Sequence, residues 1–136
     1  MEDSIIKLSL VEKNPGNNEM LPFHYFDILK QDTVVGKISL RFGNNFHSYY
    51  NGHVGFEIFP EYQGNNYAFQ GLKLVVDIAK QHEINELYLT CKQSNIASRK
   101  IFEKIGANLL EIAKIPESCF FYRAGIEDYA IYRLQL

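Results

Sequence analysis

The chain has 136 residues, of which 46% are hydrophobic, and this length and composition predict a single compact domain over residues 1–136. The formal net charge of −2 and the pI near 6.1 provide no overall attraction to nucleic acid or anionic lipid, so we expect neither as a partner. The N-terminal stretch MEDSIIKLSLVEK has no apolar run typical of a signal peptide or membrane span, which predicts a cytoplasmic protein.

The first part of the chain has the pattern of antiparallel strands. Residues 4–11 alternate polar and apolar side chains, which is the period of a half-buried strand. Residues 14–22 are dense in turn formers and predict a loop. Residues 23–30 and 34–42 lie on either side of a short polar turn and predict a β-hairpin. Residues 43–52 predict a second loop, which is unusually rich in aromatic residues.

The centre of the chain changes from a strand period to a helix period. Residues 54–59 form an apolar run typical of a strand, and Pro60 leads from it into a turn rich in glycine and asparagine. Residues 66–82 then repeat small or apolar side chains every three or four positions. This spacing predicts an amphipathic helix that packs on the sheet.

The last part of the chain predicts a second helix among strands. Residues 86–91 read as a strand, residues 95–105 as a helix that ends at Gly106, and residues 109–115 and 128–136 as two further strands. The elements together predict an α+β fold with three-layer character: a mixed, mostly antiparallel sheet of about seven strands with two main helices.

One pair of strands has a predicted orientation. A strand, a helix and a second strand most often form a parallel pair joined by a right-handed crossover. Here the pair would be residues 54–59 and residues 86–91.

The cysteines add little chemistry. Cys91 and Cys119 are too few for a disulfide framework and lack the spacing of metal ligands, so we expect both to be reduced and expect no metal. Cys91 lies inside a strand-like run, which predicts a position in the core.

The turn at residues 63–66 opens directly into the first predicted helix. The first turn of a helix carries N–H groups without internal partners and a partial positive charge, so it can hold the diphosphate of a nucleotide-like cofactor. The alternative is a plain connection from strand to helix, which any α/β protein needs.

Two motifs on these elements resemble those of one family. PEYQGNNYA at residues 60–68 resembles the acyl-CoA loop Q/R-x-x-G-x-G/A of the GNAT superfamily of N-acyltransferases. NIASRKIFEKIGA at residues 95–107 resembles the same family's N-x-x-S/A-x-x-x-Y/F-x-x-x-G-A/F segment. Asn66 replaces the middle glycine of the first motif, and asparagine is the non-glycine residue that best tolerates a positive φ.

The resemblance implies a binding site for acetyl-CoA as co-substrate. Main-chain amides of the turn would face the CoA diphosphate, where side chains pointing inward would occupy the place of the phosphates. Gln63 would fix the course of the turn. The residues implied are Gln63, Gly64, Asn65, Asn66, Tyr67 and Ala68.

The resemblance also implies that the central strand separates from the following strand. Backbone groups of Ile58 and Phe59 would then hydrogen-bond the pantetheine arm and polarise the thioester carbonyl. Asn95 would touch the pantetheine arm. Its alternative role is to cap the second helix by accepting a hydrogen bond from the Ser98 amide, and both roles can hold together.

Phe102 departs from the pattern of the family. Many members have a tyrosine at this place, whose hydroxyl can protonate the departing CoA thiolate, and phenylalanine cannot donate. Water could supply the proton instead, since the thiolate is a tolerable leaving group.

A neutral amine acceptor requires a base or a water path. Glu57 on the central strand is our first candidate for the base, and its alternative is an outward carboxylate paired with a lysine. His53 is the runner-up. His47, Tyr49 and Tyr50 would line an acceptor pocket or form a loop packed by its own aromatic rings, and we favour the second interpretation for the two tyrosines.

The short loop at residues 14–22 leaves no room for the helices that family members usually place between their first two strands. Residues 116–126 or a second subunit would have to cover that face of the sheet and shape the acceptor pocket. We therefore predict a homodimer.

These interpretations predict an acetyl-CoA-dependent N-acetyltransferase that acts by direct transfer in a ternary complex, similar to the ribosomal-protein and small-amine acetylating branches. The acceptor would be a small-molecule amine, or an N-terminal or lysine amine of a protein. One alternative is a catalytically weak or inactive CoA-binding module, which Phe102 favours. A second is an unrelated α+β domain that binds a ligand or protein through the aromatic residues 46–50.

Overall fold

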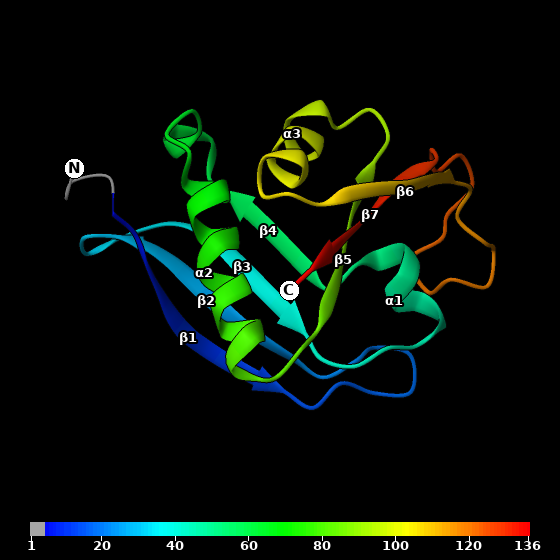
Figure 1. Ribbon diagram of the computed structural model, residues 1–136, viewed down its shortest axis with the longest axis horizontal. Coiled ribbons are helices and arrows are strands. Elements are labelled where there is room, and N and C mark those ends of the chain that lie inside the picture. Colours follow the sequence, from blue (N-terminus) through cyan, green and yellow to red (C-terminus); the bar gives the residue numbers. More distant parts are fainter. Residues whose placement is uncertain (1–4) are drawn as a thin grey trace.

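The computed structural model describes residues 5–136 and confirms the predicted α+β class (Figure 1). Its strands are β1 (Lys7–Asn14), β2 (Phe23–Lys30), β3 (Thr33–Arg41), β4 (Val54–Ile58), β5 (Glu86–Lys92), β6 (Asn108–Ala113) and β7 (Tyr129–Gln135). Its helices are α1 (Phe46–Asn51), the short 3-10 helix η2 (Pro60–Tyr62), α2 (Tyr67–Gln81) and α3 (Ile96–Lys104). No helix within residues 5–136 is both long and apolar enough to cross a bilayer.

The strands form two antiparallel sheets rather than one continuous sheet. The first has the order β1-β2-β3-β4 and the second the order β5-β7-β6. Strands β4 and β5 begin close together and diverge along their length, so a gap separates the sheets (Figure 1). The predicted parallel pair therefore has the right neighbours and direction but no hydrogen-bonded ladder.

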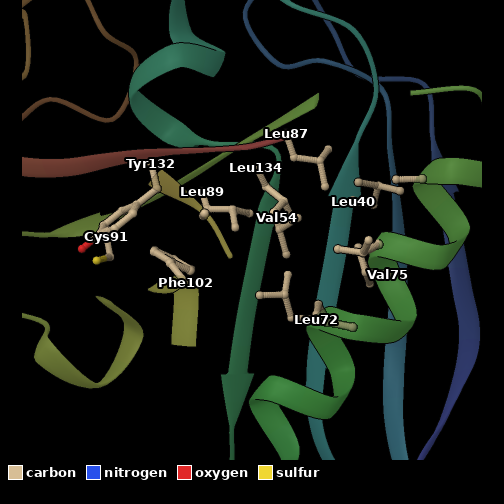
Figure 2. Packing of buried hydrophobic residues seen from close by; sticks show 14 of the residues in the cluster. Leu40, Val54, Leu72, Val75, Leu87, Leu89, Cys91, Phe102, Tyr132 and Leu134 are labelled. Carbon is tan, nitrogen blue, oxygen red and sulfur yellow. The ribbon is translucent and has the colours of Figure 1, made fainter. Parts of the chain in front are cut away.

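One hydrophobic core nevertheless spans both sheets (Figure 2). Helix α2 buries one face against the first sheet, and a Cβ added to Gly71 would lie 3.3 Å from Ile28 Cδ1, which shows how closely the helix approaches. The buried side chains labelled in Figure 2 are Leu40, Val54, Leu72, Val75, Leu87, Leu89, Cys91, Phe102, Tyr132 and Leu134. The core therefore holds the two sheets together where backbone pairing does not.

The prediction of a loop over residues 43–52 is wrong in part, because this segment contains α1. The Asn45 side chain accepts a hydrogen bond from the Ser48 amide at 2.8 Å, and Ser48 Oγ accepts one from the Asn45 amide at 3.0 Å. This reciprocal capping stabilises a helix of only 6 residues. The Tyr49 ring packs on Tyr88 of β5 and its hydroxyl donates to Glu111, so these aromatic residues fix the helix to the second sheet.

The connection between β6 and β7 packs against α1, whereas the covering of the open sheet face by residues 116–126 or by a second subunit stays a prediction. The Phe120 amide donates to Nδ1 of His47 at 3.3 Å, and the two rings pack edge to face at 5.2 Å. The predicted strand over residues 4–11 lies three residues further along, at Lys7–Asn14, and Ser4 is outside the described residues.

His53 forms the junction at which β4 meets β5. Its amide donates to the Tyr88 carbonyl at 2.8 Å, and the Tyr88 amide donates to His53 Nδ1 at 2.9 Å. In a regular parallel ladder the His53 carbonyl would accept the next hydrogen bond, from the Thr90 amide. The His53 carbonyl instead accepts from the Arg41 amide of β3 at 2.7 Å, so the ladder ends here and the strands separate beyond His53. Gly52 permits the close approach, since a Cβ there would lie 3.1 Å from the Tyr88 carbonyl oxygen.

We expect His53→Ala to lower the free energy of unfolding by about 2–4 kcal/mol, because it creates a cavity and leaves the buried Tyr88 amide without an acceptor. His53→Asn should cost less, because its side-chain oxygen can accept from the same amide. Urea denaturation at pH 7 measures both variants. Equal losses for the two would show that the hydrogen bond to Tyr88 contributes nothing.

Stability should also depend on the protonation of His53. Burial lowers the pKa of this side chain below its ordinary value, so the unfolded chain binds the proton more readily. The stabilisation by neutral His53 is complete above about pH 6.5 and is lost as the pH falls towards the folded-state pKa.

Urea denaturation between pH 7.5 and 5 should therefore show a smaller loss of stability in His53→Asn than in the wild type. The pKa of His24 is lowered as well, mainly by burial, and this contribution cancels in the comparison. Identical pH dependence in the two proteins would contradict the assignment.

Candidate functional site

A cavity of about 460 Å³ lies between the start of α2, strand β4 and helix α3. Its lining comprises residues 56–58 of β4, residues 62–64 and Asn66 of the turn, residues 67–69 of α2, and Ala97, Ser98 and Ile101 of α3. The two motifs singled out in the sequence therefore face each other across one cavity.

The turn before α2 leaves a run of backbone donors free. No hydrogen bond within residues 5–136 engages the N–H groups of residues 64–69, and no side chain caps the helix. Asn66 adopts the left-handed conformation, with φ 67°, that its glycine-like position requires. The arrangement is an anion site made of main-chain amides at the positive end of a helix.

Side-chain hydrogen bonds hold this turn in shape. The side-chain amide of Gln63 donates to the Ile58 carbonyl at 3.0 Å, and that of Asn65 donates to the Tyr62 carbonyl at 3.0 Å. Gly64 has φ 87°, and a Cβ at this position would extend into open space with no atom within 4 Å. The free amides are therefore not blocked by the chain itself.

Two lysines near the turn were missed by the sequence analysis. Lys104 Nζ lies 3.4 Å from Asn66 Oδ1 and 4.2 Å from the centre of the Phe69 ring. Lys73 Nζ lies 5.6 Å from the same ring. Both cations add to the positive potential of the free amides. Lys104 belongs to the second motif, and only the packing of α3 towards the turn reveals its position.

A second cavity of about 380 Å³ lies in the gap between β4 and β5. It shares Phe56 and Ser98 with the first cavity, so the two are neighbours across these side chains. Its lining comprises Arg41, Asn51, Val54, Gly55, Phe56, Thr90, Cys91, Lys92, Asn95, Ser98, Phe102 and Tyr129. A long flexible ligand whose anionic end sits at the turn can extend from one cavity into the other.

The backbone of β4 supplies donors to this gap, but not at both predicted residues. The Phe59 amide donates to Val35 at 3.0 Å, and the Phe59 carbonyl accepts from Tyr62 at 2.9 Å, so Phe59 is engaged within the chain. Since Phe59 points towards β3, strand alternation directs the amides of Ile58 and Phe56 towards the gap. The structure thus keeps Ile58 and indicates Phe56 in place of Phe59.

Asn95 caps α3, and its side-chain oxygen accepts from the Ser98 amide at 3.1 Å. Its Nδ2 group has no hydrogen bond to the rest of the described chain and lines the gap cavity. The capping role is confirmed, and the remaining donor is available to a ligand.

Phe102 is buried, with 2% of its surface exposed, between the rings of Phe56 and Tyr132. It brings no hydroxyl to the gap. Tyr129 of β7 lines the same cavity and carries the hydroxyl that Phe102 lacks, and burial raises the pKa of this hydroxyl, which stays protonated at neutral pH. Burial raises the pKa of Cys91 to about 11, which keeps it a thiol at neutral pH.

The two candidate bases differ sharply in their surroundings. Glu57 is exposed and lines the first cavity, and Lys37, opposite it in the register, pairs with Asp27 at 3.6 Å instead. His53 is 4% exposed, and its Nε2 donates to the Gly43 carbonyl at 2.9 Å while Nδ1 accepts from Tyr88. His53 therefore has no free lone pair, and Glu57 does.

Solved structures share this fold. An acetyl transferase from Salmonella typhimurium that modifies the N-terminal serine of ribosomal protein L7/L12 is 19% identical, with a TM-score of 0.66 over 84% of this chain and 64% of its own. The ribosomal-protein-S5-alanine acetyltransferase from Vibrio fischeri is 21% identical, with a TM-score of 0.67 over 83% and 61%. RimL, a ribosomal L7/L12 alpha-N-protein acetyltransferase in complex with coenzyme A, is 20% identical, with a TM-score of 0.67 over 84% and 62%.

The chain covers less than two thirds of the length of each of these structures. No curated protein matches it. Among residues 5–136, no group of three or more His, Cys, Asp or Glu side chains is placed to hold a metal ion.

The family model for the acetyltransferase (GNAT) domain matches residues 4–108, which include the strand β4, the turn, the helix α2 and the whole second motif. The turn with free amides and the two diverging strands lie within this match. The chain therefore belongs to the GNAT acetyltransferase family.

Proposed function

We propose that this protein transfers an acetyl group from acetyl-CoA to a primary amine by direct attack in a ternary complex. The observation that carries the proposal is the placement of the free amides of residues 64–69 beside a gap between β4 and β5. Coenzyme A in the RimL structure supports the choice of co-substrate.

The turn would bind the diphosphate of the co-substrate. Its main-chain amides need no side-chain rearrangement to reach the phosphate oxygens, and Gln63 and Asn65 hold the backbone in place. Lys104 and Lys73 would contribute further attraction through charge. This set of donors is well suited to an anion that approaches from solvent.

The gap between β4 and β5 would orient the acetyl end of the co-substrate. The amides of Phe56 and Ile58 would donate to the pantetheine arm and to the thioester carbonyl oxygen, where negative charge develops. The side-chain amide of Asn95 would add a further donor. When the amine nitrogen bonds to the acetyl carbon, the bond from carbon to sulfur breaks, one proton leaves the nitrogen and one joins the sulfur.

Glu57 would accept the proton from the amine. It is the carboxylate that lines the cavity near Phe56 and Ile58. Tyr129 or water would deliver the proton to sulfur, because Phe102 cannot. The acceptor would be a small-molecule amine, or an N-terminal or lysine amine of a protein, and the ribosomal-protein acetyltransferases of the same fold support the second class.

A CoA-binding module without turnover is the second candidate function, and the phenylalanine at position 102 is the observation that favours it. Membership of the GNAT family removes the unrelated binding domain. The homodimer and the cytoplasmic location stay predictions.

Gly64→Ala should weaken acetyl-CoA binding about tenfold or more, because the added methyl group points into the space beside the free amides. Gly125→Ala is a matched control: its φ is 82°, and a Cβ there also meets no atom within 4 Å. Each variant should lose about 1 kcal/mol of stability to backbone strain. Calorimetric titration with acetyl-CoA measures the affinities, and equal affinities for both variants would refute the diphosphate site.

Glu57→Gln should lower kcat/KM for the amine about a hundredfold, because the proton acceptor is lost. Glu61→Gln removes an exposed carboxylate outside the cavity and should behave as the wild type. Release of free CoA thiol over a panel of amines is the readout. An unchanged kcat/KM would reject Glu57 as base, and tight binding without amine-dependent thiol release would favour the CoA-binding module.

A further inference from the structure

Arg41, the last residue of β3, places a guanidinium on the face of the first sheet opposite α2. Its neighbour Leu40 points into the core, so strand alternation turns Arg41 to the other face. Nη1 donates to the Gly52 carbonyl at 3.1 Å. A Cβ added to Gly55 would lie 3.6 Å from Nη2, so the guanidinium lies over Gly55 of β4.

This guanidinium has no carboxylate partner within residues 5–136. The ion pairs there involve Lys37 and Arg133, and neither Glu19 nor Glu86, which line cavities adjoining Arg41, comes within 4.0 Å of it. Burial lowers the pKa of Arg41, yet an arginine stays charged at neutral pH. A half-buried cation with one carbonyl partner retains several unused donors.

The charged residues that line the gap cavity with Arg41 are all cationic. Lys92 also lines it, and none of its described lining residues is acidic. Such a cavity attracts anions and repels cations, since few counter-charges are available in it. A polyamine, which needs carboxylates around its remaining ammonium groups, does not fit this lining.

Arg41 and Glu57 are arranged along one sheet face. Arg41 lies over Gly55, and Glu57 is two residues further along β4, hence on the same face. Alternate residues of a strand are about 7 Å apart, a span that a small molecule with two functional groups can bridge.

We propose that Arg41 binds a carboxylate of the acceptor, so that the protein acetylates amines that carry an acid group a few bonds from the nitrogen. The amine would lie towards Glu57 and the acid towards Arg41. This inference rests on the proposed acetyltransferase function. A free amino acid and a peptide with an acidic residue next to its N-terminus both present the required carboxylate.

Matched acid and amide pairs test the proposal with wild-type protein at saturating acetyl-CoA. One arm compares free amino acids with their primary carboxamides, and a second compares peptides with aspartate or asparagine at the second position. The acid should be preferred about tenfold or more in kcat/KM, corrected for the fraction of neutral amine, as expected for a charge-assisted hydrogen bond. A larger preference for acid over amide among the free amino acids identifies a free amino acid as the acceptor. A larger preference among the peptides identifies a peptide N-terminus.

Variants then assign the preference to Arg41. Arg41→Gln should lower the ratio of acid to amide about tenfold, whereas Arg41→Lys, which keeps the charge, should retain most of it. Lys80→Gln is a control that removes an exposed cation from the last turn of α2, at the opposite end from the free amides, and should leave the ratio as in the wild type. Acetyl-CoA affinity and urea denaturation check that each variant is folded.

Two results would overturn the inference about Arg41 without affecting the proposed acetyltransferase function. One is a preference of the wild type for amides or polyamines over acids. The other is an unchanged ratio of acid to amide in Arg41→Gln. Absence of turnover with every amine would instead count against the proposed function. In that case calorimetric titration of the acid and amide pairs into the complex with CoA still decides the role of Arg41, because it requires no chemistry. Equal binding of acid and amide there would refute it.

Discussion

The arrangement of this molecule depends on the junction between His53 and Tyr88. Here the His53 amide donates to β5 while the His53 carbonyl accepts from Arg41 of β3, so backbone pairing between β4 and β5 stops after one contact. The buried core still holds the two sheets side by side. A gap with unpaired backbone donors thus exists inside a well-packed fold, although unpaired strand edges are normally covered or paired.

The candidate site is built mainly from backbone groups, which explains how it tolerates unusual side chains. Asn66 replaces a glycine without altering the turn, because it adopts a positive φ. Phe102 removes a hydroxyl but keeps the aromatic packing with Phe56. Of these two departures from the family motif, Asn66 lies at the turn with free amides and Phe102 lies beside the gap cavity, so only Phe102 would affect proton transfer in the proposed reaction.

Periodic patterns made much of the fold predictable. Residues 23–30 coincide with β2, and the helix expected at residues 66–82 is α2 to within one residue at each end. The helix α1 was missed because its 6 residues depend on capping by Asn45 and Ser48 and on aromatic packing against β5, neither of which has a periodic signal. Arg41 could not be recognised from sequence either, because its proposed role follows from its position over Gly55 on a neighbouring strand.

A ligand bound in the gap between the sheets would also raise the thermal stability of the protein. A molecule seated there would contact both sheets and would be released on unfolding, so its binding free energy would add to the stability of the folded chain. At a hundredfold excess over its dissociation constant this amounts to about 2.7 kcal/mol. The lifetime of the folded protein would then increase with the concentration of its acyl donor.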